Sequence, residues 1–370
     1  MPYDTVAEVI EYLAQPFMIT PASRLHPVYW GVFLGCGVLA FLMASRRNEA
    51  GEASSRSLLA FIFPRKYYLH RSSLTDLKLY IAGYFVRFPV PGLKAFNTSL
   101  VAAAVAGLAQ PLFPDASDQP LSLAALLLLT VLVAMANDLV TYCTHRLSHE
   151  WRVLWPFHEV HHSAEVMTPI TVSRKHPVFS LVHNLLHPFI AGPLIGLLAA
   201  GFGQTGFVQI LGINLVYALF NFAGANLRHS HIWISYGPIL SRVFVSPAMH
   251  QIHHSIDPKH HNKNYGEIFA IWDWAFGSIY VPRGREELTF GILDQDHRHR
   301  VQPHGSLREA YVRPFLDSYD AITERPVKPA TIVDAYEQPK PLESEAGGQG
   351  AVEGWRNDAT DDAPRTAPIS

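Results

Sequence analysis

Five apolar runs divide this chain of 370 residues, and they restrict its fold more than any other feature. The first, from Val28 to Ser45, is uncharged over 18 residues, which is enough for a marginal membrane-spanning helix. The others extend over residues 95–113, 121–135, 179–202 and 207–225. We therefore predict an all-α integral membrane bundle of about four to five transmembrane helices. The alternative is that some runs, such as 179–202 with its two histidines, are buried helices of a soluble protein.

The composition supports a membrane protein and excludes some classes of function. Charged residues make up 16% of the chain and apolar residues 49%, which is lean in charge for a soluble protein. A net charge of −2 offers no concentrated basic face, so we expect no nucleic-acid partner. Two cysteines provide neither a disulfide framework nor a cysteine-rich metal site. Any metal would therefore be held by nitrogen and oxygen, and the 20 histidines need an explanation.

The basic residues predict the orientation of the bundle. Five of them follow the first run between Arg46 and Lys66, which by the positive-inside tendency places residues 46–78 in the cytosol. With five crossings, the segments after Ala136 and after Ala225 also lie in the cytosol. Those two segments contain the histidine clusters, so we predict a histidine-rich helical cap on the cytosolic side.

Three clusters of histidines have helical spacing. HRLSH uses the i, i+4 spacing, whereas HEVHH and HQIHH use i, i+3, i+4, and both spacings place imidazoles on one face of a helix. One HxxxH is weak evidence for a metal site, but two HxxHH clusters after it are strong evidence. The clusters are formed by His145 and His149, by His158, His161 and His162, and by His250, His253 and His254.

The number of imidazoles indicates two metal ions. Eight exceed the four ligands of one tetrahedral zinc, whereas two ions could take about four each. Imidazole binds iron, zinc and copper alike, so the ligand type leaves the metal open. Soluble di-iron bundles use Glu and Glu-x-x-His ligands, a pattern that is absent here.

Four further residues are candidates for the same site. His229 ends the fifth apolar run and is a candidate ninth ligand. His176 could be a ligand or could support one. A ligating imidazole usually donates its other N–H to a carboxylate or carbonyl, so Asp138 and Asp273 are candidate supporting carboxylates, or else capping groups.

The remaining histidines are predicted to have no metal role. His183 and His187 face either the bundle interior or the site, and we expect satisfied core histidines; His231 is expected to be a polar neighbour. We interpret His260 and His261 as part of a solvated or headgroup-contacting loop between lysines. An ordinary surface or interfacial position is predicted for His26, His70, His297, His299 and His304.

The clusters and their flanks resemble the fatty acid hydroxylase/sterol desaturase superfamily over roughly residues 125–295. The matching blocks are NDLVTYCTHRLSH, LWPFHEVHHSAEVM, RKHP, HSHIWISYGP, VSPAMHQIHHS and NYGEIFAIWDWAFGSIYVP. The resemblance implies a catalytic domain over 96–295, after an N-terminal anchor and cytosolic linker (1–95). The polar composition after Arg325 predicts a disordered tail over 325–370.

The resemblance also implies an activity. Such proteins are integral membrane, non-haem di-iron enzymes that use O₂ to hydroxylate or desaturate C–H bonds of lipids. No fused cytochrome b5 domain is visible, so electrons are expected from a separate cytochrome b5 or ferredoxin-type donor. Hydroxylation and desaturation begin with the same hydrogen abstraction, and sterol, fatty acyl, carotenoid, ether-lipid and ornithine-lipid substrates all fit. One departure is Ala225, where hydroxylase relatives can have a further histidine; that metal would be one ligand short or completed by water or Asn226.

Two other classes compete with the oxygenase. A membrane metal hydrolase would activate water at the ions, but the chain has no HExxH motif, and Glu159 is not placed as its base. A histidine-rich metal transporter would place polar ligands near the bilayer midplane, whereas these clusters follow the apolar runs at the membrane edge.

Overall fold

The structure is a computed structural model, and the part that it describes consists mainly of helices. It describes residues 27–46, 57–86, 91–114, 116, 120–204, 209–210, 213–294 and 298–323. The predicted tail over 325–370 and the part of the predicted anchor before residue 27 lie outside these residues. All helices and strands described below belong to one compact unit that ends at Ile332.

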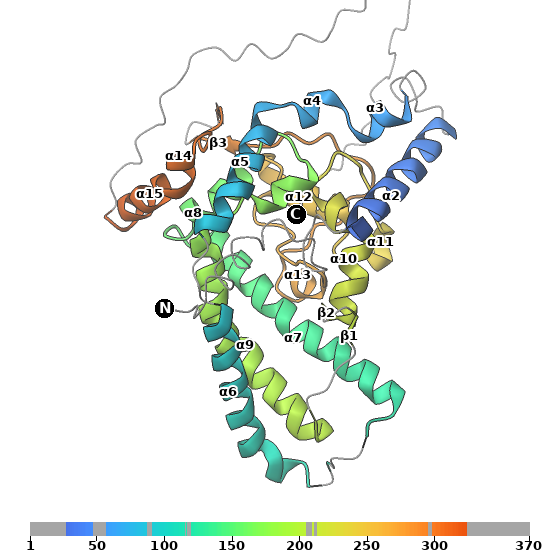
Figure 1. Ribbon diagram of the computed structural model, residues 1–370, viewed down its shortest axis with the longest axis vertical. Coiled ribbons are helices and arrows are strands. Elements are labelled where there is room, and N and C mark those ends of the chain that lie inside the picture. The colour runs from blue at the N-terminus through green and yellow to red at the C-terminus, as the bar shows by residue number, and fades with distance from the viewer. Residues whose placement is uncertain are drawn as a thin grey trace, which may run out of the picture. The chain divides into compact units, whose positions relative to one another are not determined.

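Three long helices pack side by side and extend away from a group of short helices (Figure 1). They are α6 (Pro91–Ala109), α7 (Leu123–Glu150) and α9 (Pro177–Phe202), and α9 contacts both of the others. Gly196 allows the close approach of α9 to α6, because a Cβ there would lie 2.5 Å from the Ala102 carbonyl oxygen. Small residues commonly allow such contacts between helices in membranes.

Among the described residues, two helices, α7 and α9, are long and apolar enough to cross a membrane. The helix α2 (Pro27–Arg46) has a shorter apolar segment. The fifth apolar run differs from the prediction, because a two-stranded ribbon, β1 (Gln209–Ile210) and β2 (Ile213–Asn214), precedes the helix α10 (Leu215–Arg228). Fourteen residues of helix extend about 21 Å, less than the ~30 Å of a hydrocarbon core.

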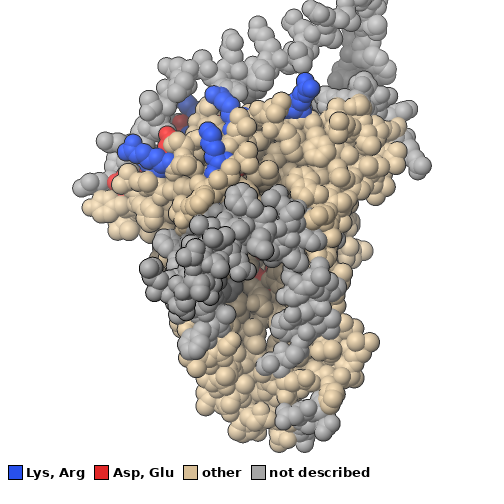
Figure 2. All heavy atoms as spheres, in the orientation of Figure 1, with Lys and Arg blue, Asp and Glu red and all other residues tan. Residues whose placement is uncertain are grey.

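A cap of short helices gathers at the end where α7 finishes and α9 begins (Figure 1). Exposed charged side chains are also concentrated at this end (Figure 2). The cap contains α8 (Trp155–His162), η3 (Pro169–Ser173), α11 (Gly237–Leu240), α12 (Pro247–His253), η4 (Pro258–His260), α13 (Ile271–Ala275), α14 (Leu307–Tyr311) and α15 (Arg313–Ile322). The other described elements are α3 (Leu58–Ile62), α4 (Arg65–Tyr68), α5 (Arg71–Val86), η2 (Gln110–Leu112), and the ribbon of β3 (Ile292–Leu293) and β4 (His299–Arg300).

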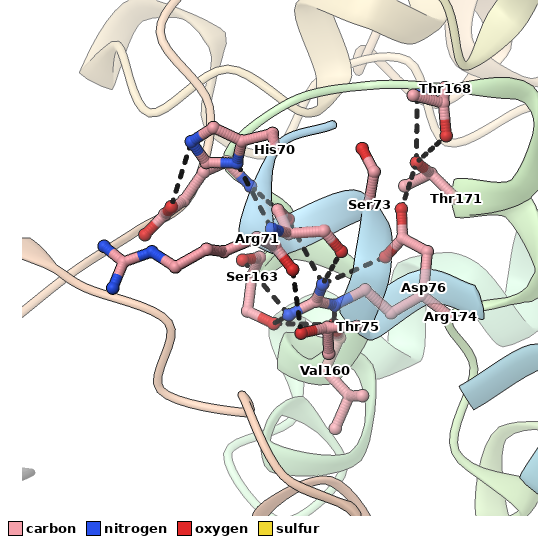
Figure 3. Close-up of polar contacts among 12 residues, drawn as sticks. His70, Arg71, Ser73, Thr75, Asp76, Val160, Ser163, Thr168, Thr171 and Arg174 are labelled. Carbon is pink, nitrogen blue, oxygen red and sulfur yellow. Dashed lines mark hydrogen bonds and ion pairs between the residues drawn. The ribbon is translucent and has the colours of Figure 1, made fainter. Parts of the chain in front are cut away.

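A fully buried ion pair fastens α8 to α5 (Figure 3). Arg174 lies 2.9 Å from the Asp76 carboxylate, and both side chains are inaccessible to solvent. Its guanidinium also donates to the carbonyl oxygen of Val160 and to the hydroxyl of Ser163, each at 2.9 Å. These acceptors lie at the C-terminal end of α8, where a positive charge and N–H donors satisfy the last carbonyls. Arg174 therefore fixes the helix that carries the HEVHH cluster.

The carboxylate of Asp76 depends on this arrangement. Burial raises the pKa of Asp76, and the charge of Arg174 and hydrogen bonds from Arg174 and Thr171 oppose that rise. The Thr171 hydroxyl donates to it at 2.6 Å. If one partner of the pair were removed, the other would remain as a buried charge without its counter-ion.

We predict that Arg174→Ala will lower the free energy of unfolding by about 3–5 kcal/mol, because it leaves Asp76 buried without its counter-ion. The double variant Arg174→Met with Asp76→Leu should recover much of this loss, since buried pairs replaced by apolar residues are often tolerated. Unfolding of purified protein in detergent measures both. Lys259→Ala, which removes a solvent-exposed ion pair with Glu286, is the control and should change little. Equal effects of Arg174→Ala and the control would contradict the role given to the buried pair.

Candidate metal centre

Nine histidines converge in two adjacent groups at the junction of the cap with α7 and α9. Within each group, the candidate ligand atoms all lie within 4.8 Å of one another. His149 is half-buried, and the other eight are buried. The five-histidine group contains His145, His149, His158, His162 and His253, and the four-histidine group contains His161, His229, His250 and His254.

The two HxxHH helices divide their histidines between the groups in opposite ways. In α8, the i, i+4 pair His158 and His162 belongs to the five-histidine group, whereas His161 belongs to the other. In the segment of α12, the i, i+4 pair His250 and His254 belongs to the four-histidine group, whereas His253 joins the first. Neighbouring residues therefore face different groups. The rings of His162, in the five-histidine group, and His254, in the four-histidine group, stack on each other with their centroids 4.4 Å apart.

One ring nitrogen of each histidine in the five-histidine group lacks a protein partner. The Nε2 atoms of all five are buried and make no hydrogen bond. Buried polar atoms in folded proteins are nearly always satisfied, so five such atoms around one point need a common partner. A cation accepts lone pairs from several imidazoles at once, which makes this donor set suited to a metal ion.

The four-histidine group has the spacing of ligands on one ion. Its Nε2 atoms lie 3.3 Å apart for His229 and His161, 3.0 Å for His250 and His229, and 3.2 Å for His254 and His250. Metal–nitrogen bonds of about 2.1 Å place two nitrogens about 3.0 Å apart at a right angle and about 3.4 Å apart at a tetrahedral angle. The observed separations agree with these values, so the residues present fit a bound metal.

Burial keeps the cap histidines neutral. It lowers the pKa of His158, His161, His162, His250 and His254 well below the ordinary value, and the charges of neighbouring histidines and lysines or arginines lower it further. For His253, burial lowers the pKa to about 4. A neutral imidazole is the form that binds metals, so these groups need to lose no proton near neutral pH.

One loop orients two of the candidate ligands through its backbone. His145 donates from Nδ1 to the carbonyl oxygen of Tyr265, and His253 donates from Nδ1 to that of Lys263, both at 2.7 Å. This choice of tautomer leaves Nε2 of each ring facing the five-histidine group. The side chain of Asn264 holds the loop by donating to the carbonyl of Met249 and accepting from the N–H of Tyr280.

The two predicted carboxylates accept hydrogen bonds from backbone N–H groups of this loop and of the segment that follows it. Asp273 accepts hydrogen bonds from the backbone N–H groups of Tyr265 and Gly266, each at 2.8 Å. Asp138 lies on α7 and accepts from the N–H groups of Ile268 and Phe269 at 3.1 and 3.0 Å. Asp273 is thus connected to His145 by hydrogen bonds through the Tyr265–Gly266 backbone.

His176 is placed apart from both groups. It caps the N-terminus of α9, where its Nδ1 accepts from the N–H of Val178, and its Nε2 donates to the carbonyl of Tyr311. Its ring packs against Phe157 at 4.9 Å. With both nitrogens engaged, it joins α8, α9 and α14 and contributes no atom to either histidine group.

The predictions for two of the remaining histidines, His260 and His304, are wrong, and that for His187 is confirmed. His260 is buried against Glu286, 3.1 Å away, rather than in a solvated loop. His304 is buried too and lies 3.2 Å from the Glu159 carboxylate, rather than at the surface. His187 is a satisfied core histidine between Thr98 and Asn137, and His231 is a polar neighbour that donates to the carbonyl of Phe61.

Several supporting groups carry little signal at the level of sequence. Arg174 lies in the RKHP block, but nothing in the spacing indicated a fully buried charge or its partner Asp76, nearly one hundred residues earlier. The carbonyls of Lys263 and Tyr265 carry no sequence signal, because every residue has one.

A cavity of about 340 Å³ opens beside the five-histidine group. His149, His162 and His253 line it together with Trp155 and Ile292, so its wall combines metal-ligand candidates with apolar side chains. Small molecules bind in concave sites of this mixed character. The cavity gives one side of the centre access to solutes.

Comparisons with known proteins identify the segment that carries this centre. The model of the fatty acid hydroxylase family matches residues 130–278, which include all nine histidines. Alkylglycerol monooxygenase of Caenorhabditis elegans is 26% identical over 44% of this chain and 29% of its own length. Ornithine lipid hydroxylase OlsE of Rhizobium tropici is 32% identical over 41% of each chain.

A third relative, lathosterol oxidase of Mus musculus, is 25% identical over 47% of this chain and 52% of its own length. The chain thus spans about half or less of the length of these curated relatives. No solved structure matches it. The histidine pattern, the family match and the three relatives agree in assigning residues 130–278 to the fatty acid hydroxylase/sterol desaturase superfamily.

Proposed function

We propose that this protein is an O₂-dependent lipid hydroxylase or desaturase with two iron ions. The observation that carries the proposal is the division of nine histidines, eight of them buried, into two groups whose ring nitrogens face one another. One ion would be held by the five-histidine group and the other by the four-histidine group. When bound, the iron pair supplies the oxidising power needed to cleave an aliphatic C–H bond.

The relatives support a membrane lipid as the substrate. Their names refer to alkylglycerols, ornithine lipids and lathosterol, which differ in their polar groups and share a long apolar body. The chain would act on an unactivated C–H bond of such a molecule, of sterol or fatty acyl type. Its own residues would limit the access of water to the side of the centre that faces the cavity, since eight of the nine histidines are buried.

The membrane arrangement is part of the proposal. The helices α7 and α9 meet the centre at one end, so a bilayer around them would have both metals near one face. We propose that this face is cytosolic, that about four to five helices cross the membrane, and that a separate cytochrome b5 or ferredoxin-type protein donates the electrons.

The surroundings of Glu159 favour oxygenation over metal-assisted hydrolysis. This carboxylate lies inside HEVHH, where a hydrolase would need a general base beside the metal. It is instead engaged by Arg300 at 2.9 Å and by His304 at 3.2 Å. These partners lower its pKa against the opposing effect of burial, so it is an ionised structural contact between α8 and the C-terminal segment.

Metal analysis tests the proposal at the level of each group. Purified protein should contain about two irons per chain, and His253→Ala and His161→Ala should each weaken a different site and abolish turnover of lipid extracts under O₂. Iron content and mass spectrometry of the lipids measure these effects. His231→Ala is the matched control, because it removes a buried histidine outside both groups. Zinc alone with hydrolytic turnover, or full activity of either ligand variant, would refute the proposal.

The loop that carries Tyr265 gives a second prediction. Asp273→Ala removes two hydrogen bonds to the loop backbone and should weaken metal binding by about 10–100-fold, the usual effect of losing a group that orients a ligand. Ser278→Ala removes only the hydroxyl that donates to Asp273 and should have a smaller effect. Titration of metal-free protein with Fe²⁺ under anaerobic conditions compares the two. Wild-type affinity in Asp273→Ala would show that the loop does not orient His145.

A further inference from the structure

The helix α15 presents a stripe of exposed apolar side chains. Val312, Phe315, Leu316, Tyr319 and Ile322 follow one another at intervals of three, one, three and three residues, which places them on one helical face. Each is about half-exposed or more, and Ile322 reaches 62%. We call this set the α15 stripe. Contiguous exposed apolar surface of this kind marks a contact with a membrane or a partner.

The other sides of α15 hold the helix in a fixed orientation. Asp317 and Ser318 are buried, and the Ser318 hydroxyl donates to the carbonyl of Val153 at 2.9 Å. Arg313 donates to Asp317 at 2.7 Å along a polar side that also includes Asp320. The helix therefore has a docked side, a polar side and an apolar side. This is the pattern of a helix that lies in a membrane interface.

Ring contacts place the stripe level with the start of α9. The ring of Phe315 lies 5.3 Å from that of His176 and 5.0 Å from that of Phe157. His176 is the N-cap of α9, which has no charged residue and is one of the two helices able to cross a membrane. The α15 stripe thus begins where the apolar surface of α9 begins.

A second exposed apolar site lies beside α7 at the same end of the bundle. Trp274 and Phe276 are 66% and 53% exposed, and the ring of Phe276 stacks on that of Tyr142 at 5.4 Å. Tyr142 lies on α7 about two turns before His149. Exposed aromatic residues are enriched where helices leave a membrane, so α7 and α9 carry interfacial groups near the same end.

We propose that α15 lies flat in the membrane–water interface with the α15 stripe in lipid. The occupant of the stripe is the bilayer itself, because the stripe continues the apolar surface of α9 and has its charged groups on a separate side. The inference rests on one part of the proposed function, the embedding of the protein in a membrane. It places the lipid surface next to Phe157, which precedes His158 of the five-histidine group. A lipid substrate in the bilayer would therefore lie close to the candidate metal centre.

Depth measurements on the full chain test this placement. Nitroxide labels are attached at Leu316→Cys and Ile322→Cys in the stripe, at Asp320→Cys on the polar side, and at Leu197→Cys on α9. The protein is reconstituted in nanodiscs of phosphatidylcholine and phosphatidylglycerol. Wild-type protein, labelled in parallel, gives the background from Cys36 and Cys143. Collision with O₂, which concentrates in lipid, is compared with collision with a water-soluble nickel complex.

The expected result is a ratio of O₂ to nickel collisions several-fold higher at Leu316 and Ile322 than at Asp320, and close to that at Leu197. Equal, water-like ratios at Leu316, Ile322 and Asp320 would overturn the proposal. So would labels shielded from both reagents with spin–spin broadening, because that result means that a second copy covers the stripe. Turnover is not measured, so a wrong assignment of the reaction would leave this outcome unchanged.

Discussion

The convergence of nine imidazoles, eight of them buried, is the constraint on which the rest of the structure depends. An imidazole has two ring nitrogens, and a buried ring needs a partner for each. The loop at 263–265 supplies carbonyl partners for His145 and His253, which leaves their second nitrogens facing the centre. Asp273, Asn264 and Asp138 then hold the polypeptide that offers those carbonyls. Much of the polar interior of the cap therefore orients these rings.

The scaffold of the centre extends beyond the segment that matches the family. Asp76 lies on α5, more than fifty residues before residue 130, yet it pairs with the arginine that caps α8. His304 and Arg300 lie after residue 278 and hold Glu159, on the outer side of the same helix. The helix α8 has only eight residues, too few to be stable alone, so its position depends on these contacts from both ends of the chain.

The sequence predicted the parts of the fold that periodicity encodes. Helical spacing brought out the three clusters, and the apolar runs located α7 and α9, because burial and helix geometry act on consecutive residues. The allocation of each histidine was not predictable, since it depends on how α8 and α12 pack rather than on their own spacing. For the same reason His304 and His260 were misplaced: their carboxylate partners are distant in sequence or lie in an irregular segment. The break before α10 was hidden by an apolar composition that suits both a strand and a helix.

The opposite allocation of histidines in α8 and α12 has a consequence for how the centre fills. His161 and His162 are peptide neighbours that face different groups, as are His253 and His254. In the proposed two-ion centre, an ion in one group would hold both short helices and so order donors of the other group before a second ion arrives. Part of the conformational entropy lost on binding the second ion would then already have been lost with the first, which would make the two binding events positively cooperative. By thermodynamic reciprocity each ion would strengthen the binding of the other by the same factor, so chains with a single ion would be rarer than independent sites would give.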